Sequence, residues 1–399
     1  MSLTTDTTTR PTTGEVFGYA CAQIHQAAAS MWPEAPVRLG AHVPSVTGYV
    51  HRMTVGDDRE LFAKHSMLGS SLVSILRGVH GPWSVIESLQ QDYAASTESL
   101  LAREAVQLKF LQARLQAATT AGLTHGVLFT NPVTGPTLLE LLLARPSSTA
   151  DLLGGVWAEL EVLHRPGAPS DLLKGTFIGE RSITGTFQRK FNGISGSVYI
   201  DHLGADRLSS GTAENVVAVV RQVVNRLLRL RSLTLPSGPP SLAYGDLKPE
   251  HIHYPSGVGG RPTFLDPGLL VAGPVVDASK LVSRTILGLI AVRPGRKTVT
   301  AVVGGVSTFT ESITPPRAVT ADLWLRELLM IWLMDTVNIM TTYLSAPATL
   351  PLPTQGLALI KAVGHICAVI ERMSWALSCG RSPRAVWDLA LRQVIEAAS

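Results

Sequence analysis

Cysteine is scarce in this chain, and its few cysteines follow no metal-ligand pattern. The 399 residues include only Cys21, Cys367 and Cys379. An odd number of cysteines without paired spacing argues against a zinc site and against a fold held together by disulfides. The same usage is typical of a reducing compartment, so we expect a cytoplasmic protein. Its 45% hydrophobic residues are enough to build the cores of two lobes.

Strong charge of one sign is also lacking. Only 16% of the residues are charged, and the formal net charge is +4. The arginines within residues 221–231 fall on one predicted helix, and we interpret them as its solvated face rather than as a nucleic-acid surface. The composition therefore predicts no nucleic-acid partner.

Signals for membrane insertion are weak as well. The apolar run 323–344 is interrupted by Arg326, Glu327 and Asp335, each of which would be costly at a bilayer centre. We expect this run to form a buried core helix. The Thr-rich residues 1–13 contain no apolar segment, so no signal peptide is expected.

Two aspartates, Asp246 and Asp266, lie in segments predicted to form a loop and the end of a short strand. Asp246 follows Gly245, which breaks any helix, and the alternating residues 252–254 predict a short strand after it. A second short apolar strand at residues 264–265 ends at Asp266. A hairpin of this kind brings both carboxylates to one end. Phosphoryl transfer from ATP needs two such carboxylates, one beside the attacking hydroxyl and one on the magnesium that bridges the phosphates.

These segments resemble the catalytic loop and the metal motif of the protein-kinase-like superfamily. The likeness is greatest to the aminoglycoside phosphotransferase and choline kinase branch, whose pattern is His-Gly-Asp with an Asn five residues after the Asp. It implies that Asp246 is the catalytic base and that Asp266 holds magnesium. It also implies that Lys248 contacts the transferred phosphate, and that His251, at the Asn position, is a second metal ligand or a phosphate contact.

The chain departs from this pattern at three positions. Tyr244 replaces the usual His, which packs the loop against the metal segment, and Pro267 replaces an aromatic residue, although Gly268 is kept. His251 is the larger change because magnesium prefers oxygen ligands to a ring nitrogen. Whether one or two metal ions bind is therefore left open.

The spacing after Asp266 favours the small-molecule branch. Protein kinases place a long activation segment and an Ala-Pro-Glu signature there, whereas here Asp277 and a helical run over residues 278–290 follow almost at once. In the small-molecule branch an aspartate at this place caps the helix and braces the catalytic loop. We expect Asp277 to do both.

The resemblance implies an N-terminal lobe of antiparallel strands with a lysine held by a glutamate. Residues 37–40, 48–53 and 60–65 read as three strands, and Lys64 at the end of the third is the expected phosphate ligand. The loop 41–47 occupies the place of a glycine-rich phosphate loop without its glycines. Ser45 and Thr47 are its candidate phosphate contacts.

A periodic amphipathic helix over residues 100–111 supplies the partner of Lys64. Glu104 is the favoured partner, and Glu98 is the alternative. After a helix stop at Gly122, residues 126–132 are expected to form the strand and hinge against which adenine would lie.

The remainder of the chain reads as mostly helical. The helical spans are expected at residues 137–144, 151–164, 214–233, 278–290, 298–311, 321–344, 353–372 and 383–398. His164 is expected to end the second helix and to pack in the core, with no catalytic role. Residues 175–211 could form a lid over the acceptor or a surface loop. Because late helices of the resembled family close the acceptor pocket with acidic residues, the resemblance implies that Glu327 and Asp335 are candidate acceptor contacts, with helix pairing or solvent exposure as their alternatives.

Together these inferences predict an α+β, two-lobed protein-kinase-like fold. The expected organisation is a disordered tail at 1–14, an ATP-binding lobe and hinge at 15–133, and a helical catalytic lobe at 134–399 that contains an inserted subdomain or lid at 175–240. The expected function is ATP- and Mg²⁺-dependent phosphorylation of a small-molecule hydroxyl, on an antibiotic, aminocyclitol, sugar or nucleoside-like acceptor.

Two other functions remain open. A nucleotide-binding pseudokinase with a regulatory or scaffold role is suggested by Tyr244, His251 and the weak phosphate loop. A protein kinase is suggested by the sequence Asp-Leu-Lys-Pro-Glu at residues 246–250. The Lys-poor composition, rich in Ala, Arg, Gly and Leu, is typical of high-GC bacteria, and it suggests antibiotic resistance or biosynthesis as the setting. The acceptor, the choice between ATP and GTP, and the oligomeric state stay undetermined.

Overall fold

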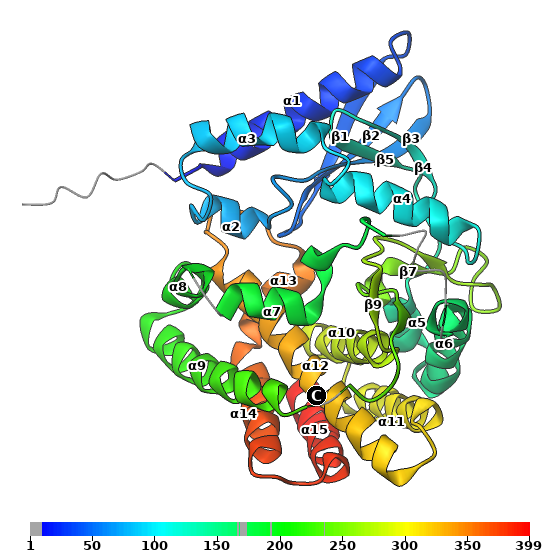
Figure 1. Ribbon diagram of the computed structural model, residues 1–399, viewed down its shortest axis with the longest axis vertical. Helices are drawn as coiled ribbons and strands as arrows, with labels where there is room; N and C mark the ends of the chain where they lie inside the picture. Colours follow the sequence, from blue (N-terminus) through cyan, green and yellow to red (C-terminus); the bar gives the residue numbers. More distant parts are fainter. Residues whose placement is uncertain (1–9, 166, 168–173, 192–193, 235) are drawn as a thin grey trace, which may run out of the picture.

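Two lobes make up the protein (Figure 1). The computed structural model describes residues 10–165, 167, 174–191, 194–234 and 236–399. It contains 59% helix and 11% strand, with the larger sheet confined to the N-terminal lobe. The α+β two-lobed fold predicted from the sequence is confirmed. Of the predicted tail 1–14, residues 1–9 lie outside the described part, and Thr13 and Gly14 already belong to the first helix.

The N-terminal lobe is built on a five-stranded antiparallel sheet of order β1-β2-β3-β5-β4. Its strands are β1 (Val37–Val43), β2 (Tyr49–Val55), β3 (Arg59–His65), β4 (Thr120–Thr124) and β5 (Val127–Thr130). The three strands expected before residue 66 and the strand before the hinge are present. Gly122, expected to stop a helix, lies inside β4 instead.

Four helices accompany this sheet: α1 (Thr13–Met31), α2 (Leu72–Leu76), α3 (Trp83–Ala95) and α4 (Leu100–Gln112). One face of α1 packs its small and aliphatic residues, among them Ala20, Ile24 and Ala27, on buried sheet residues such as Met53 and Phe129. Helix α4 was predicted; α1, α2 and α3 were not.

The C-terminal lobe is helical. Its helices are α5 (Leu138–Ala144), α6 (Thr149–His164), α7 (Ile183–Phe191), α8 (Ile194–Asp201), α9 (Ser210–Ser232), α10 (Val275–Val292), α11 (Arg296–Ile313), α12 (Ala318–Ser345), α13 (Thr354–Lys361), α14 (Val363–Ser378) and α15 (Pro383–Ala398). The single helix expected over residues 353–372 is divided into α13 and α14 at Ala362.

Helix α12 runs through the middle of this lobe and packs along α10 (Figure 1). By length and composition it could cross a membrane, but 94% of its most apolar window is buried within the protein. It is therefore a core helix, as the sequence indicated.

Two small antiparallel pairs flank the segment that carries Asp246. Strand β6 (Ser241–Ala243) pairs with β9 (Leu270–Ala272), and β7 (Ile252–His253) pairs with β8 (Thr263–Phe264). Because β6 leads into Asp246 while β8 leads into Asp266, both aspartates stand at the same edge of these pairs.

The described part of residues 175–211 is packed rather than an irregular loop. It contains a 3₁₀ turn at Gly179–Arg181 and the helices α7 and α8. Phe187 of α7 is fully buried, and Lys190 of the same helix donates to the carbonyl of Asn338 in α12 at 2.6 Å. The surface-loop alternative is therefore wrong for these residues.

Candidate active site

The loop that carries Asp246 has a backbone only glycine can supply. Gly245 has a φ of +81°, and a Cβ there would lie 2.1 Å from the carbonyl oxygen of Gly268. Tyr244 fastens the same loop to the second motif, because its buried hydroxyl donates to the carbonyl of Leu265 at 2.8 Å. Tyrosine at this position thus performs the packing that the sequence resemblance assigns to a histidine.

Asp277 braces the loop from below. Its two carboxylate oxygens accept hydrogen bonds at 2.7 Å from the backbone N–H groups of Tyr244 and Gly245. The predicted brace is present, but the predicted N-cap is wrong: Pro274 occupies the N-cap position of α10, and Asp277 lies in the first turn of that helix. There its charge also favours the positive end of the helix dipole.

His164 contributes to this brace. Its ring Nε2 lies 3.0 Å from Oδ2 of Asp277, at the end of α6. His164 is packed at the end of α6, as expected. Its partner, however, is the carboxylate of Asp277 and not only the C-terminal end of its own helix.

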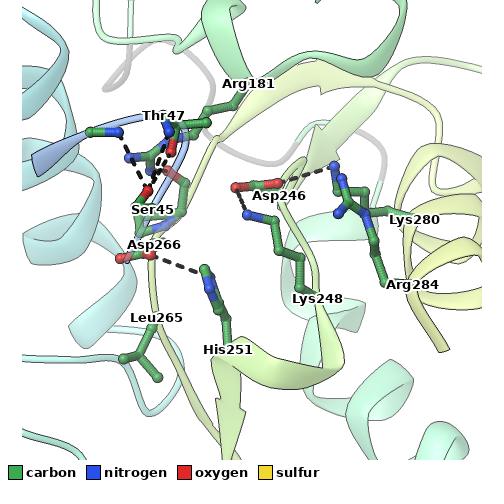
Figure 2. A network of polar contacts seen from close by, with 12 residues as sticks. Ser45, Thr47, Arg181, Asp246, Lys248, His251, Leu265, Asp266, Lys280 and Arg284 are labelled. Carbon is green, nitrogen blue, oxygen red and sulfur yellow. Dashed lines mark hydrogen bonds and ion pairs between the residues drawn. The ribbon is translucent and has the colours of Figure 1, made fainter. Parts of the chain in front are cut away.

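Asp246 is surrounded by cations (Figure 2). Its carboxylate oxygens lie 2.8 Å from Nζ of Lys248 and 3.2 Å from Nζ of Lys280. Burial alone would raise the pKa of Asp246, but these two lysines outweigh burial and hold that pKa well below its ordinary value. Asp246 is therefore an ionised hydrogen-bond acceptor at neutral pH.

The pKa of Lys248 shifts downward as well. Burial is the first cause, opposed by Asp246 and reinforced by the nearby charge of Lys280. Lys248 is thus a largely buried cation held beside the carboxylate of Asp246.

Asp266 faces the same space from the other strand (Figure 2). It has a φ of +53°, in the left-handed region that aspartate tolerates better than most residues. Its carboxylate is ion-paired with Lys64, and its Oδ2 lies 3.3 Å from Nδ1 of His251, without the geometry of a hydrogen bond. Burial would raise the pKa of Asp266, but Lys64 and then His251 lower it.

The contact predicted between Lys64 and Glu104 is present. Nζ of Lys64, on β3, lies 2.8 Å from Oε1 of Glu104, whose side chain is fully buried on α4. The alternative partner, Glu98, is exposed. Burial would lower the pKa of Lys64, but Asp266 and Glu104 together raise it.

Ser45 and Thr47 lie in the turn between β1 and β2. The hydroxyl of Ser45 accepts from the backbone N–H of Thr47 at 3.3 Å and of Gly48 at 3.5 Å, so it stabilises the turn itself (Figure 2). Their role as phosphate contacts stays a prediction.

The two candidate acceptor contacts are engaged elsewhere. Asp335 is 1% exposed, and its oxygens accept from Lys280 at 2.8 Å, Ser283 at 2.8 Å and Arg284 at 2.7 Å. No oxygen of Asp335 is left for an acceptor, so its predicted role is wrong and the helix-pairing alternative describes it. Glu327 accepts from the backbone N–H of Ser237 at 2.8 Å, and nothing in its contacts indicates an acceptor.

Two site residues were missed by sequence reasoning. Lys280 lies three residues after Asp277 on α10, and this helical spacing could have placed it on the same face. Arg181 donates to Glu104 from the distant segment 179–181, and no local pattern in the sequence announces that contact.

The residues available for a metal ion are Asp266 and His251. No group of three or more His, Cys, Asp or Glu side chains arranged for a metal exists within the described ranges. Magnesium in nucleotide sites takes one or two carboxylates and draws its other ligands from phosphate and water. Asp266 fits that requirement, whereas the imidazole of His251 is a poor magnesium ligand.

Solved structures with a similar fold were found, all at low sequence identity. An ethanolamine kinase of Plasmodium vivax has a TM-score of 0.47 and 12% identity, over 86% of this chain and 85% of that one. A type VIII aminoglycoside-3′-phosphotransferase has a TM-score of 0.41 and 17% identity, over 77% and 99% of the two chains. A choline kinase of Cryptosporidium parvum has a TM-score of 0.40 and 8% identity, over 97% and 95%.

These neighbours come from the group that the sequence motifs resemble. No protein-family model matches the chain, and no curated protein matches it in sequence. With TM-scores below 0.5, these likenesses carry no functional argument, and the function of the chain has to be inferred from the geometry of the site.

Proposed function

We propose that this protein transfers the γ-phosphate of ATP to a hydroxyl group of a small molecule. One observation carries the proposal: Asp246 and Asp266 face the same space (Figure 2), and Asp266 is ion-paired with Lys64 of the N-terminal lobe, which the buried Glu104 of that lobe also contacts. Two carboxylates and a fixed lysine at the junction of two lobes form the polar arrangement that phosphoryl transfer requires.

Asp246 would orient the acceptor hydroxyl and receive its proton. The low pKa of Asp246 makes it a weak base, but phosphoryl transfer passes through a loose transition state in which positioning matters more than basicity. Lys248, 2.8 Å away, would contact the transferred phosphate and offset its charge. The proton of the hydroxyl passes to Asp246 as the new O–P bond forms and the bond to the ADP oxygen breaks.

The nucleotide would be held by residues from both lobes. Lys64 would contact the α- and β-phosphates while Glu104 fixes its position. Asp266 would hold Mg²⁺, which when bound neutralises charge on the phosphates. Ser45 and Thr47, in the turn above them, are the residues proposed to cover the phosphates.

A small acceptor is favoured over a protein acceptor. Only residues 267–274 separate Asp266 from the start of α10, which leaves no space for a segment that could dock a protein substrate. We propose an antibiotic, aminocyclitol, sugar or nucleoside-like alcohol, and an intracellular role in resistance or in biosynthesis. The composition supports that setting, as described above.

Transfer of labelled γ-phosphate from Mg-ATP into pooled aminoglycosides, macrolides, aminocyclitols, sugars and nucleosides tests the proposal. The wild type should label one class of molecule, and Asp246→Asn should label none. Asp322→Asn, which changes an exposed aspartate on α12, is the matched control and should behave as the wild type.

The pseudokinase alternative has one observation in its favour, since both oxygens of Asp246 are engaged by lysines. It predicts nucleotide binding that is indifferent to magnesium, without transfer to any pool.

A further inference from the structure

A row of buried polar side chains lies on one face of α4. Arg103, Glu104 and Gln107 are all less than a tenth exposed, although they are charged or polar. Their spacing places them on neighbouring positions of the helix surface. Burying such groups is costly unless each has partners, so the segments that supply those partners are bound closely to α4.

Besides Lys64, which pairs with Glu104, two segments supply the partners: residues 176–181, from the part of the chain inserted before α7, and residues 267–269, which follow Asp266. Gln107 joins them, because its Nε2 donates to the carbonyl of Thr176 at 2.7 Å and its Oε1 accepts from the N–H of Leu269 at 2.9 Å. The N–H of Ile178 also donates to the carbonyl of Leu269 at 3.4 Å. Residues 176–181 are therefore wedged between α4 and the loop after Asp266.

Consecutive residues of α4 and of this wedge form two adjacent ion pairs. Arg103 pairs with Glu180, and Nη1 of Arg103 also donates to the carbonyl of Phe177 at 2.7 Å. Glu104 pairs with Arg181. On α4 a cation is followed by an anion, and in the wedge an anion is followed by a cation. A shift of the wedge by one residue would bring like charges together, so the two pairs fix its register against the helix.

Arg181 also reaches the metal motif. Its Nη1 donates to the carbonyl of Pro267, while its Nη2 donates to Oε2 of Glu104. A Cβ at Gly268 would lie 2.9 Å from Cβ of Arg181, so the glycine allows the arginine to pack against this loop. One guanidinium thus connects the helix that carries Glu104 to the loop that carries Asp266.

Charge balance shows why this connection matters. Glu104 uses Oε1 for Lys64 and Oε2 for Arg181, while Lys64 also pairs with Asp266. Lys64 and Arg181 therefore neutralise the carboxylates of Glu104 and Asp266 in a region with little solvent exposure. Without Arg181, one lysine would have to satisfy both carboxylates, and the fully buried Glu104 would keep an unpaired oxygen.

We propose that Arg181 is a positioning residue for phosphoryl transfer. It acts through Glu104 and the Pro267 carbonyl, so that residues 176–181 hold α4, Lys64 and the Asp266 loop in their working arrangement. The kinetic part of this inference rests on the proposed function. The structural part concerns only the place of α4.

Arg181→Ala and the charge-preserving Arg181→Lys test the proposal, with Arg229→Ala as the matched control. Arg229 is an exposed arginine of α9 and is not among the residues that join residues 176–181 to α4. Hydrogen exchange of residues 100–112 in the whole protein should quicken by about tenfold in Arg181→Ala, less in Arg181→Lys, and not in Arg229→Ala. Unchanged exchange in Arg181→Ala would overturn the proposal.

A double-mutant cycle separates action through Glu104 from an independent effect. Arg181→Ala should weaken binding of Mg-ATP by about tenfold to a hundredfold, the range typical of a lost charged hydrogen bond. In a Glu104→Gln background the same change should weaken binding by no more than about twofold, because Arg181 has lost its charged partner. Effects that multiply across the cycle would contradict a role through Glu104.

The outcomes also distinguish this inference from the proposed function. A wild type that binds Mg-ATP but transfers no phosphate overturns the function, and the cycle in binding still decides the role of Arg181. A wild type that binds no nucleotide also overturns the function, and hydrogen exchange at α4 then decides whether Arg181 positions that helix.

Discussion

Lys280 links Asp246 to the buried interior of the helical lobe. Its ammonium lies 3.2 Å from Oδ1 of Asp246 and 2.8 Å from Oδ1 of Asp335, so one lysine joins the loop that carries Asp246 to α12. Arg284, one turn further along α10, completes the group through Asp335. The position of Asp246 therefore depends on Lys280 and, through Lys280, on the buried charges of Asp335 and Arg284.

Replacing Asp335 should destabilise the protein strongly. Asp335→Asn leaves Lys280 and Arg284 as buried cations that share too little negative charge, and breaking such a pair costs about 3 to 5 kcal/mol. Urea unfolding measures the loss, and the exposed Asp322→Asn should change stability by less than about 0.5 kcal/mol. A loss below about 1 kcal/mol in Asp335→Asn would contradict the buried network.

Replacing Lys64 should weaken nucleotide binding. Lys64→Met removes the cation that Glu104 and Asp266 share, and with it the contact proposed for the phosphates. The dissociation constant for Mg-ATP, from titration of a fluorescent analogue, should rise by about tenfold to a hundredfold. Lys109→Met changes an exposed lysine of α4 and should have no effect. Equal affinities for Lys64→Met and the wild type would exclude Lys64 from the nucleotide site.

Stability should fall as the pH falls from about 6.5 to about 4. Burial lowers the pKa of His65 from 6.5 to about 4, and the ring is only 2% exposed. Between these values the unfolded chain binds a proton that the folded protein does not, so the stabilising contribution is complete above pH 6.5 and is lost toward pH 4. His65→Leu should flatten the slope of unfolding free energy against pH by up to about 1.4 kcal/mol per pH unit. An unchanged slope would mean that His65 is accessible to protons in the folded state.

Replacing His251 with asparagine should lower the Mg²⁺ concentration that ATP turnover requires. His251→Asn places an oxygen ligand beside Asp266, where the wild type has an imidazole whose pKa is lowered to about 4 by burial and by Lys248. The half-saturating Mg²⁺ concentration for ATP turnover should fall severalfold. The same requirement in both proteins would show that position 251 is not at the metal, and chelation by EDTA should abolish turnover in each.

The fold and the centre of the site could be predicted because their signals are local. Gly245 followed by Asp246 predicts a turn that carries a carboxylate. The strand pattern of β3 predicts the position of Lys64, and the helical periodicity of α4 predicts that Glu104 faces the protein interior. Each of these depends on residues within a few positions of one another.

The parts that could not be predicted depend on contacts between distant segments. Arg181 reaches Glu104 across 77 positions, and Asp335 meets Lys280 across 55, so neither pairing leaves a periodic trace in the sequence. Asp335 was a candidate acceptor contact because late helices of the resembled family close the acceptor pocket with acidic residues, whereas here its partners on α10 account for its burial. The first helix was missed because its capping box, Thr12 with Glu15, adjoins a Thr-rich stretch that reads as a polar tail.

Turnover of ATP with water as the acceptor tests phosphoryl transfer most directly, because it requires no knowledge of the natural acceptor. Release of labelled phosphate from γ-labelled ATP is followed over hours, with and without Mg²⁺, for the wild type, Asp246→Asn and Asp322→Asn. We expect slow, Mg²⁺-dependent release by the wild type and by Asp322→Asn, and a rate lower by about a hundredfold or more in Asp246→Asn, which should still bind the nucleotide. A wild type that binds ATP yet releases phosphate no faster than Asp246→Asn would contradict phosphoryl transfer through Asp246.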